Sequence, residues 1–222
     1  MKSKLLTGLL GFFIAILIIT FSIGLPIYVR PFYYLQIDLL DIPEDSGASR
    51  EDIITAFNEV MDYLTLPGEE FSTGIFRHSE SGKSHFVDCK RLFDLNICAF
   101  FISLIGAATL LMLNKRKVFE LWRPFGMNVS FFSGAYTLGV FALIGGLAAL
   151  DFDKAFEIFH HIFFPGKDNW QFNWYYDEII RILPQDFFMN CAILILTSVI
   201  LLGIGCVVGG LVERRMRRKK ES

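Results

Sequence analysis

Four long apolar blocks without a single charged residue constrain this 222-residue chain more than any other feature. They extend from about Leu5 to Val29, Leu95 to Leu113, Met127 to Leu150, and Phe187 to Val212. A hydrocarbon core about 30 Å thick requires about 20 helical residues, and each block is long enough. Only a helix satisfies all backbone groups within one such segment. The sequence therefore predicts an all-α membrane protein with four transmembrane helices.

The remaining residues divide into segments between these helices. The predicted transmembrane ranges are 1–29, 95–113, 127–150 and 187–212, with connecting segments 30–94, 114–126 and 151–186 and a tail at 213–222. The first block differs from a secretory signal because its apolar run is too long and because Pro26, Tyr28 and Arg30 occur at its end in place of a small-residue cleavage site. We expect it to be a retained anchor.

Basic residues predict the orientation of these helices. Twelve of the 21 basic residues lie before the first block, between the second and third, and after the fourth. Since short cytoplasmic segments are enriched in Lys and Arg, we expect both termini in the cytoplasm. The predicted cytoplasmic segments then carry a net charge of +9 and the outer segments −11. An acidic outer surface argues against a nucleic-acid partner, and the basic tail fits a topology anchor better than a specific site for anionic lipid.

The first outer segment, 30–94, is predicted to form part of a small mixed cap. Ser49 and Asp52 resemble a capping box that opens an amphipathic helix, which Pro67-Gly68 ends. Its apolar face consists of Ile53, Ile54, Phe57, Val60, Met61 and Leu64. Residues 71–76 and 79–84 are typical of a strand, a turn and a returning strand. Ser84 is then expected to cap a helix that carries His85 and Asp88 into the second span.

The second outer segment, 151–186, is rich in aromatic residues. Phe152, Phe156, Phe159 and Phe163 recur at helical spacing, and His160 lies at the edge of this stripe. Pro165-Gly166 is expected to end the helix. The aromatic side chains that follow, including Trp170, suit the headgroup zone of a membrane.

All four histidines, His78, His85, His160 and His161, fall in the two outer segments. An ordinary surface role accounts for any one of them, but an imidazole near a membrane surface also suits acid–base catalysis. The chain has no serine-hydrolase elbow, His-Glu-x-x-His motif or phosphate-binding glycine loop. His85, Asp88 and His160 form a weak candidate zinc set. No ionisable residue lies deep in a span, which disfavours a transporter or channel.

Cysteine placement argues against a disulfide framework. Cys98, Cys191 and Cys206 lie inside predicted spans, where they behave as small apolar residues. Cys89 alone lies near the outer surface.

Two sequence segments in this four-span arrangement resemble a known family. The first is Ser84-His85-Phe-Val-Asp88-Cys-Lys-Arg-Leu-Phe93, and the second is Phe159-His160-His-Ile-Phe-Phe-Pro-Gly-Lys-Asp-Asn-Trp170. They are similar to the lipoprotein intramolecular transacylases of Gram-positive bacteria, and the similarity extends over nearly the whole chain.

The resemblance implies an acyltransferase that acts on a diacylated bacterial lipoprotein. Members of the family move an acyl chain from the glyceryl sn-2 position of the N-terminal cysteine to its own α-amino group, which gives the lyso-form. The two functional histidines of the family correspond to His85 and His160, with His161 as the alternative to His160. The resemblance further implies no cofactor and no metal, and a site on the outer face of the bacterial plasma membrane among its lipids.

Because one substrate carries both amine and ester, the enzyme needs no nucleophile of its own. We expect His85 and His160 to divide the proton transfers, with His85 as the favoured base and Asp88 orienting it. Asn169 and Trp170 are candidate pocket residues. Two other classes stay open: a non-enzymatic membrane interaction protein, and a metal-dependent membrane hydrolase.

Overall fold

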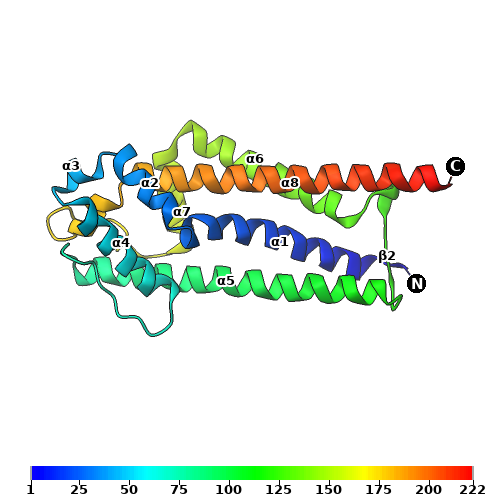
Figure 1. Ribbon diagram of the computed structural model, residues 1–222, viewed down its shortest axis with the longest axis horizontal. Coiled ribbons are helices and arrows are strands. Elements are labelled where there is room, and N and C mark those ends of the chain that lie inside the picture. Colours follow the sequence, from blue (N-terminus) through cyan, green and yellow to red (C-terminus); the bar gives the residue numbers. More distant parts are fainter. Residues whose placement is uncertain (1, 222) are drawn as a thin grey trace. The chain divides into compact units, whose positions relative to one another are not determined.

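The computed structural model describes residues 2–221 and is predominantly helical (Figure 1). Four helices are long and apolar enough to cross a membrane: α1 (Lys4–Tyr28), α5 (Glu80–Lys115), α6 (Val129–Leu150) and α8 (Gln185–Glu221). The predicted fold class, an all-α membrane protein with four such helices, is confirmed. At 1.5 Å per residue, α5 is about 54 Å long, well beyond the ~30 Å of a hydrocarbon core. Its first turns therefore extend past its apolar block.

Shorter elements connect these helices. The α-helices are α2 (Pro31–Leu39), α3 (Ile42–Ser46), α4 (Arg50–Thr65) and α7 (Phe152–Phe163), and the 3₁₀ helices are η1 (Pro124–Gly126) and η2 (Glu178–Ile182). The described residues contain two short strands, β1 (Lys2–Ser3) and β2 (Glu120–Leu121), which pair in parallel with Lys2 opposite Glu120.

The chain forms two compact units. Unit 1 contains the residues up to Ile23, Asn96–Leu147 and the residues from Ile195 onward, and unit 2 contains Gly24–Leu95 and Ala148–Leu194. Unit 1 thus consists of the apolar helices and the short pieces between them. Unit 2 holds α2, α3, α4, α7, η2 and the adjoining ends of the long helices.

Small residues allow the helices of unit 1 to approach closely. Ser133 on α6 donates a hydrogen bond of 2.9 Å to the carbonyl oxygen of Gly11 on α1. A Cβ atom on Gly134 of α6 would lie 2.6 Å from the carbonyl oxygen of Gly203 on α8. Such contacts replace the hydrophobic driving force, which lipid does not supply between helices.

Unit 2 is built around α4. Ser49 caps this helix as predicted, since its hydroxyl accepts a 3.1 Å hydrogen bond from the backbone N–H of Asp52. The predicted apolar face is buried except for Ile54, which is half-buried, and Phe57 stacks on Tyr33 of α2 with ring centroids 3.6 Å apart. The Tyr33 hydroxyl donates a 2.7 Å hydrogen bond to the carbonyl oxygen of Ile182, which ties α2 to η2.

The predicted strand–turn–strand over residues 71–84 is wrong. Residues 69–79 contain no regular element apart from a turn, and α5 begins at Glu80. Side-chain carboxylates take the backbone donors that a partner strand would need: Asp177 accepts from the N–H of Ser79 at 2.7 Å, and Glu178 from that of Arg77 at 3.1 Å.

Ser79, not Ser84, supplies the hydroxyl at the start of α5. Its Oγ accepts a 3.0 Å hydrogen bond from the N–H of Gly82, the i+3 pattern of an N-cap. His85 therefore lies in the second turn of α5, where its backbone is held by the helix on both sides.

We expect Gly134→Val to destabilise unit 1. The added side chain would collide with the α8 backbone at Gly203, and overpacking of this kind costs about 1–3 kcal/mol. Gly139→Val on the same helix is the matched control, because a Cβ there meets no atom within 4 Å. Thermal unfolding in detergent micelles should show a lower midpoint for Gly134→Val alone, and equal midpoints would contradict the packing.

Candidate active site

The first part of α5 presents several polar side chains on adjoining turns, all within unit 2. His85 lies ten residues before the apolar block that starts at Leu95. One turn later, the Cys89 sulfur lies 3.4 Å from Nε2 of His85. Asp88 is also buried, with 7% of its surface exposed.

Helix α7 places His160 on its buried side. Much of the rest of its surface is apolar and exposed, with Ile158, Phe159, Ile162 and Phe163 each 46–65% accessible. Nδ1 of His160 lies 2.7 Å from the carbonyl oxygen of Phe156, one turn earlier. Because a carbonyl oxygen can only accept, Nδ1 carries the proton, and Nε2 of the neutral ring holds the lone pair.

The imidazoles of His85 and His160 face each other across 5.7 Å between ring centroids, at an interplanar angle of 34°. Aromatic rings enclose them. Phe164 contacts both, Trp170 stacks on His160 at 4.5 Å, and Phe172 meets His85 edge-on at 5.5 Å. Each histidine is only 6% exposed. Two residues 75 positions apart in sequence therefore share one largely dry, aromatic environment.

Burial controls the charge of these imidazoles. Burial, and to a smaller extent the neighbouring His160, lowers the pKa of His85 to about 4, against the opposing effect of Asp88. Burial also lowers the pKa of His160, in part offset by its hydrogen bond to Phe156. Both rings are therefore neutral at pH 7, in the protonation state in which an imidazole acts as a base.

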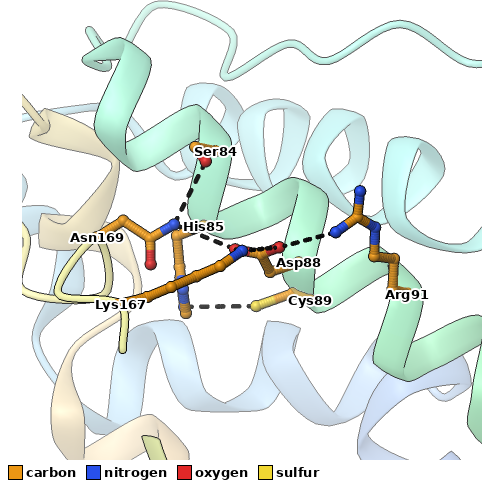
Figure 2. Close-up of polar contacts among 7 residues, drawn as sticks. All are labelled: Ser84, His85, Asp88, Cys89, Arg91, Lys167 and Asn169. Carbon is orange, nitrogen blue, oxygen red and sulfur yellow. Dashed lines mark hydrogen bonds and ion pairs between the residues drawn. The ribbon is translucent and has the colours of Figure 1, made fainter. Parts of the chain in front are cut away.

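A polar cluster lies directly beside His85 (Figure 2). The ammonium group of Lys167 lies 2.5 and 2.6 Å from the two carboxylate oxygens of Asp88, and Arg91 approaches one of them at 3.3 Å. The Asn169 amide nitrogen donates to Asp88 Oδ2 at 3.2 Å and to Ser84 Oγ at 3.4 Å. Burial raises the pKa of Asp88, but these hydrogen bonds and charges outweigh it and the pKa falls below its usual value.

The turn after α7 brings this segment back to α5. Helix α7 ends at Phe163, and Gly166 adopts a φ of +72°, a conformation that glycine tolerates well. Lys167, Asn169 and Trp170 follow at once. The ion pair between Lys167 and Asp88 then holds the segment 167–170 against the second and third turns of α5.

The structure brings together His85, His160, Asn169 and Trp170, all of which the sequence analysis named. It places the Asp88 carboxylate against Lys167 and Asn169. The side chain of His161 is 59% exposed, with Nε2 3.5 Å from Glu157. Sequence reasoning missed Lys167, Phe164 and Phe172. A helix stop at Pro165-Gly166 followed by a lysine is the signal that suggests a chain reversal there.

No group of three potential metal-ligating side chains occurs among the residues that the structure describes.

Comparisons with known proteins show the family to which this chain belongs. The family model described as "Lipoprotein intramolecular transacylase Lit" matches residues 8–188. The structure is similar to that of the membrane-integral lipoprotein intramolecular transacylase Lit from Bacillus cereus, with a TM-score of 0.86 and 24% identity over 99% of this chain and 98% of that one.

Two further B. cereus Lit structures also match. The one with the mutation H85R has a TM-score of 0.76 and 24% identity over 98% of this chain and 92% of that one. The one with H85A has a TM-score of 0.77 and 23% identity over 99% of this chain and 96% of that one. No curated protein matches the chain. At these identities the solved structures establish the fold alone. The family model covers well over half of the chain and therefore establishes the family. The protein is therefore an integral membrane acyltransferase that belongs to the lipoprotein intramolecular transacylase family.

Proposed function

We propose that this enzyme moves the sn-2 acyl chain of a diacylglyceryl-modified lipoprotein to the α-amino group of the same N-terminal cysteine, with His85 and His160 sharing the proton transfers. The observation that carries the proposal is the pair of buried imidazoles, whose ring centroids lie 5.7 Å apart. Two bases at this spacing suit a reaction in which one nitrogen loses protons and one nearby oxygen gains one.

The proton balance of the reaction calls for both histidines. The substrate α-amino group, with an ordinary pKa near 8, arrives largely as an ammonium ion and must lose two protons to become an amide N–H. The glyceryl oxygen gains one proton when the ester C–O bond breaks. One proton therefore leaves for solvent, and the other is transferred from the attacking nitrogen to the departing oxygen.

The two imidazoles suit different halves of this balance. His160, with its Nε2 lone pair fixed by the Phe156 carbonyl, suits the first deprotonation, of the ammonium. His85 then takes the second proton as the amine attacks the ester carbonyl. The low pKa of His85, about 4 through burial, makes its protonated form a strong acid that readily returns this proton to the glyceryl oxygen.

The reaction proceeds without a covalent acyl-enzyme. Holding amine and ester of one substrate in a ring-like conformation supplies the effective molarity that a nucleophilic residue would otherwise provide. Among the described residues Cys89 is the one thiol beside His85, and burial raises its pKa to about 12. It is therefore a neutral thiol at pH 7 and a poor nucleophile.

We further propose that the histidines lie on the extracytoplasmic side, with both termini in the cytoplasm. The pairing of β1 with β2 places the N-terminal residues next to the loop between α5 and α6. The ion pair of Arg123 with Glu213 joins that loop to α8. The three basic segments thus gather at one end of unit 1, as Figure 1 lets the reader follow, and the positive-inside rule assigns that end to the cytoplasm.

Replacing either catalytic histidine should abolish most activity. We expect His85→Gln and His160→Gln each to lower the rate of lyso-lipoprotein formation about 100-fold or more, because general acid–base catalysis typically contributes that much. Mass spectrometry of a diacylated lipoprotein substrate gives the readout. His161→Gln is the matched control and should keep near-normal activity. Activity that persists in EDTA would exclude the metal-dependent hydrolase. A double variant that is still active would refute the proposal.

Cys89→Ala should remain active within about threefold, since an un-ionised thiol contributes no nucleophile. The same mass-spectrometric assay measures it, together with a search for acylated Cys89 in the wild-type protein. Loss of activity combined with a trapped thioester would show that the reaction passes through an acyl-enzyme.

The two histidines should titrate at unusually low pH. In the folded protein we expect a midpoint near pH 4 for His85 and below the ordinary value of about 6.5 for His160. The unfolded chain, with ordinary pKa values, then binds more protons between about pH 6.5 and 4, so the folded state loses stability as pH falls through this window. NMR titration of histidine-labelled protein in micelles measures both midpoints, and midpoints above 6.5 would contradict the neutral pair.

A further inference from the structure

Two buried polar atoms beside the proposed catalytic pair have no hydrogen-bond partner among the described residues: Nδ1 of His85 and Oδ1 of Asn169. Leaving either atom unsatisfied carries the full desolvation penalty of a buried polar group. Figure 2 shows the Asn169 amide oxygen directed along the side of the His85 ring. An imidazole nitrogen that carries a proton donates a hydrogen bond, and an amide oxygen can only accept a hydrogen bond. These two atoms therefore complement each other.

The polar cluster determines which way the Asn169 amide faces. A carboxylate accepts hydrogen bonds and cannot donate them, so the amide group toward Asp88 must be the NH₂, as the 3.2 Å contact has it. The Ser84 hydroxyl lies on the same side, 3.4 Å from the amide nitrogen. Lys167 holds the Asp88 carboxylate in place through two contacts of 2.5 and 2.6 Å. The amide oxygen is therefore left on the side of His85.

The other nitrogen of His85 has a suitable environment for the matching tautomer. Nε2 lies 3.4 Å from the Cys89 sulfur. The thiol of Cys89 is protonated, because burial raises its pKa to about 12, and it can act as a weak donor to a lone pair at Nε2. A weak donor is readily displaced by the amine of a substrate.

We infer that Asn169 is a positioning residue: its amide oxygen accepts a hydrogen bond from Nδ1–H of His85 and so keeps the lone pair at Nε2, the atom that takes the substrate proton. The catalytic consequence rests on the function proposed above, whereas the hydrogen bond itself does not. Asp88 acts on His85 through Asn169, which transmits the orientation of the carboxylate without placing its charge against the imidazole.

An amide suits this place better than a carboxylate would. A carboxylate in direct contact would raise the pKa of His85 and favour the charged ring, which is no longer a base. The neutral amide fixes the tautomer and leaves the ring uncharged. Burial, the largest influence on the pKa of His85, can then keep the ring neutral.

The tautomers can be read directly from the full-length protein in micelles with ¹⁵N-labelled histidine. With four histidines in the chain, eight ring nitrogens are observed, and single His→Gln variants assign them. We expect a protonated Nδ1 for His85 in the wild type. Asn169→Leu, of similar size, should convert His85 into a mixture of tautomers. His160 serves as an internal control, because the Phe156 carbonyl keeps its Nδ1 protonated in both proteins.

Activity provides the second arm of the experiment. Asn169→Leu should lower kcat about 10-fold or more with little change in KM, since one hydrogen bond of about 1.4 kcal/mol corresponds to a factor of ten. Gln171→Leu is the matched control, on an exposed side chain two residues away, and should leave both kcat and the tautomers unchanged.

The outcomes separate the inference from the function on which it rests. A wild-type His85 protonated at Nε2, or an unchanged tautomer in Asn169→Leu, overturns the inference with no reference to activity. A tautomer shift with unchanged kcat removes the catalytic role of Asn169. Wild-type protein that forms no lyso-lipoprotein defeats the proposed function instead.

Discussion

The absence of water from the hydrocarbon core is the constraint on which this structure depends. Every backbone amide there must be paired within its own segment, and the four apolar blocks are consequently continuous helices. In α5 the helix does not end where the apolar block begins, but extends back through fifteen more residues to Glu80. This extension carries Ser84, His85 and Asp88. The rigid span that lipid enforces thus also provides a rigid base for the candidate site.

The candidate site combines a pair of buried imidazoles with a charged cluster around Asp88. The side chain of Asn169 separates this cluster from His85. Aromatic rings of Phe164, Trp170 and Phe172 exclude water from the histidines and keep them neutral. The charges of Asp88 and Lys167 neutralise each other at 2.5 Å. This separation matters because a buried imidazole next to an uncompensated charge would have a different pKa. The same ion pair connects two segments that are 79 residues apart in the chain.

Helix geometry accounts for much of the local order in the site. His160 bonds to the carbonyl of Phe156, and His85 approaches Cys89, in each case across one helical turn. Such contacts follow from the 3.6-residue period alone. The relation between the two histidines has a different origin, since it depends on the chain reversal at Gly166 and on the polar contacts of Lys167 and Asn169 with α5.

The sequence by itself determined the four apolar helices, the capped helix α4 with its buried face, and α7 with its stop at Pro165-Gly166, because periodicity and capping act within a few residues. A family resemblance also singled out His85 and His160. The prediction from local sequence was wrong at residues 71–84. There the backbone N–H groups of Arg77 and Ser79 bond to the distant carboxylates of Glu178 and Asp177 and not to a partner strand. Only the tertiary structure decided that the histidines meet, that Lys167 pairs with Asp88, and that Asn169 lies between Asp88 and His85. Those contacts join residues 75 or more positions apart, and no local pattern in the chain encodes them.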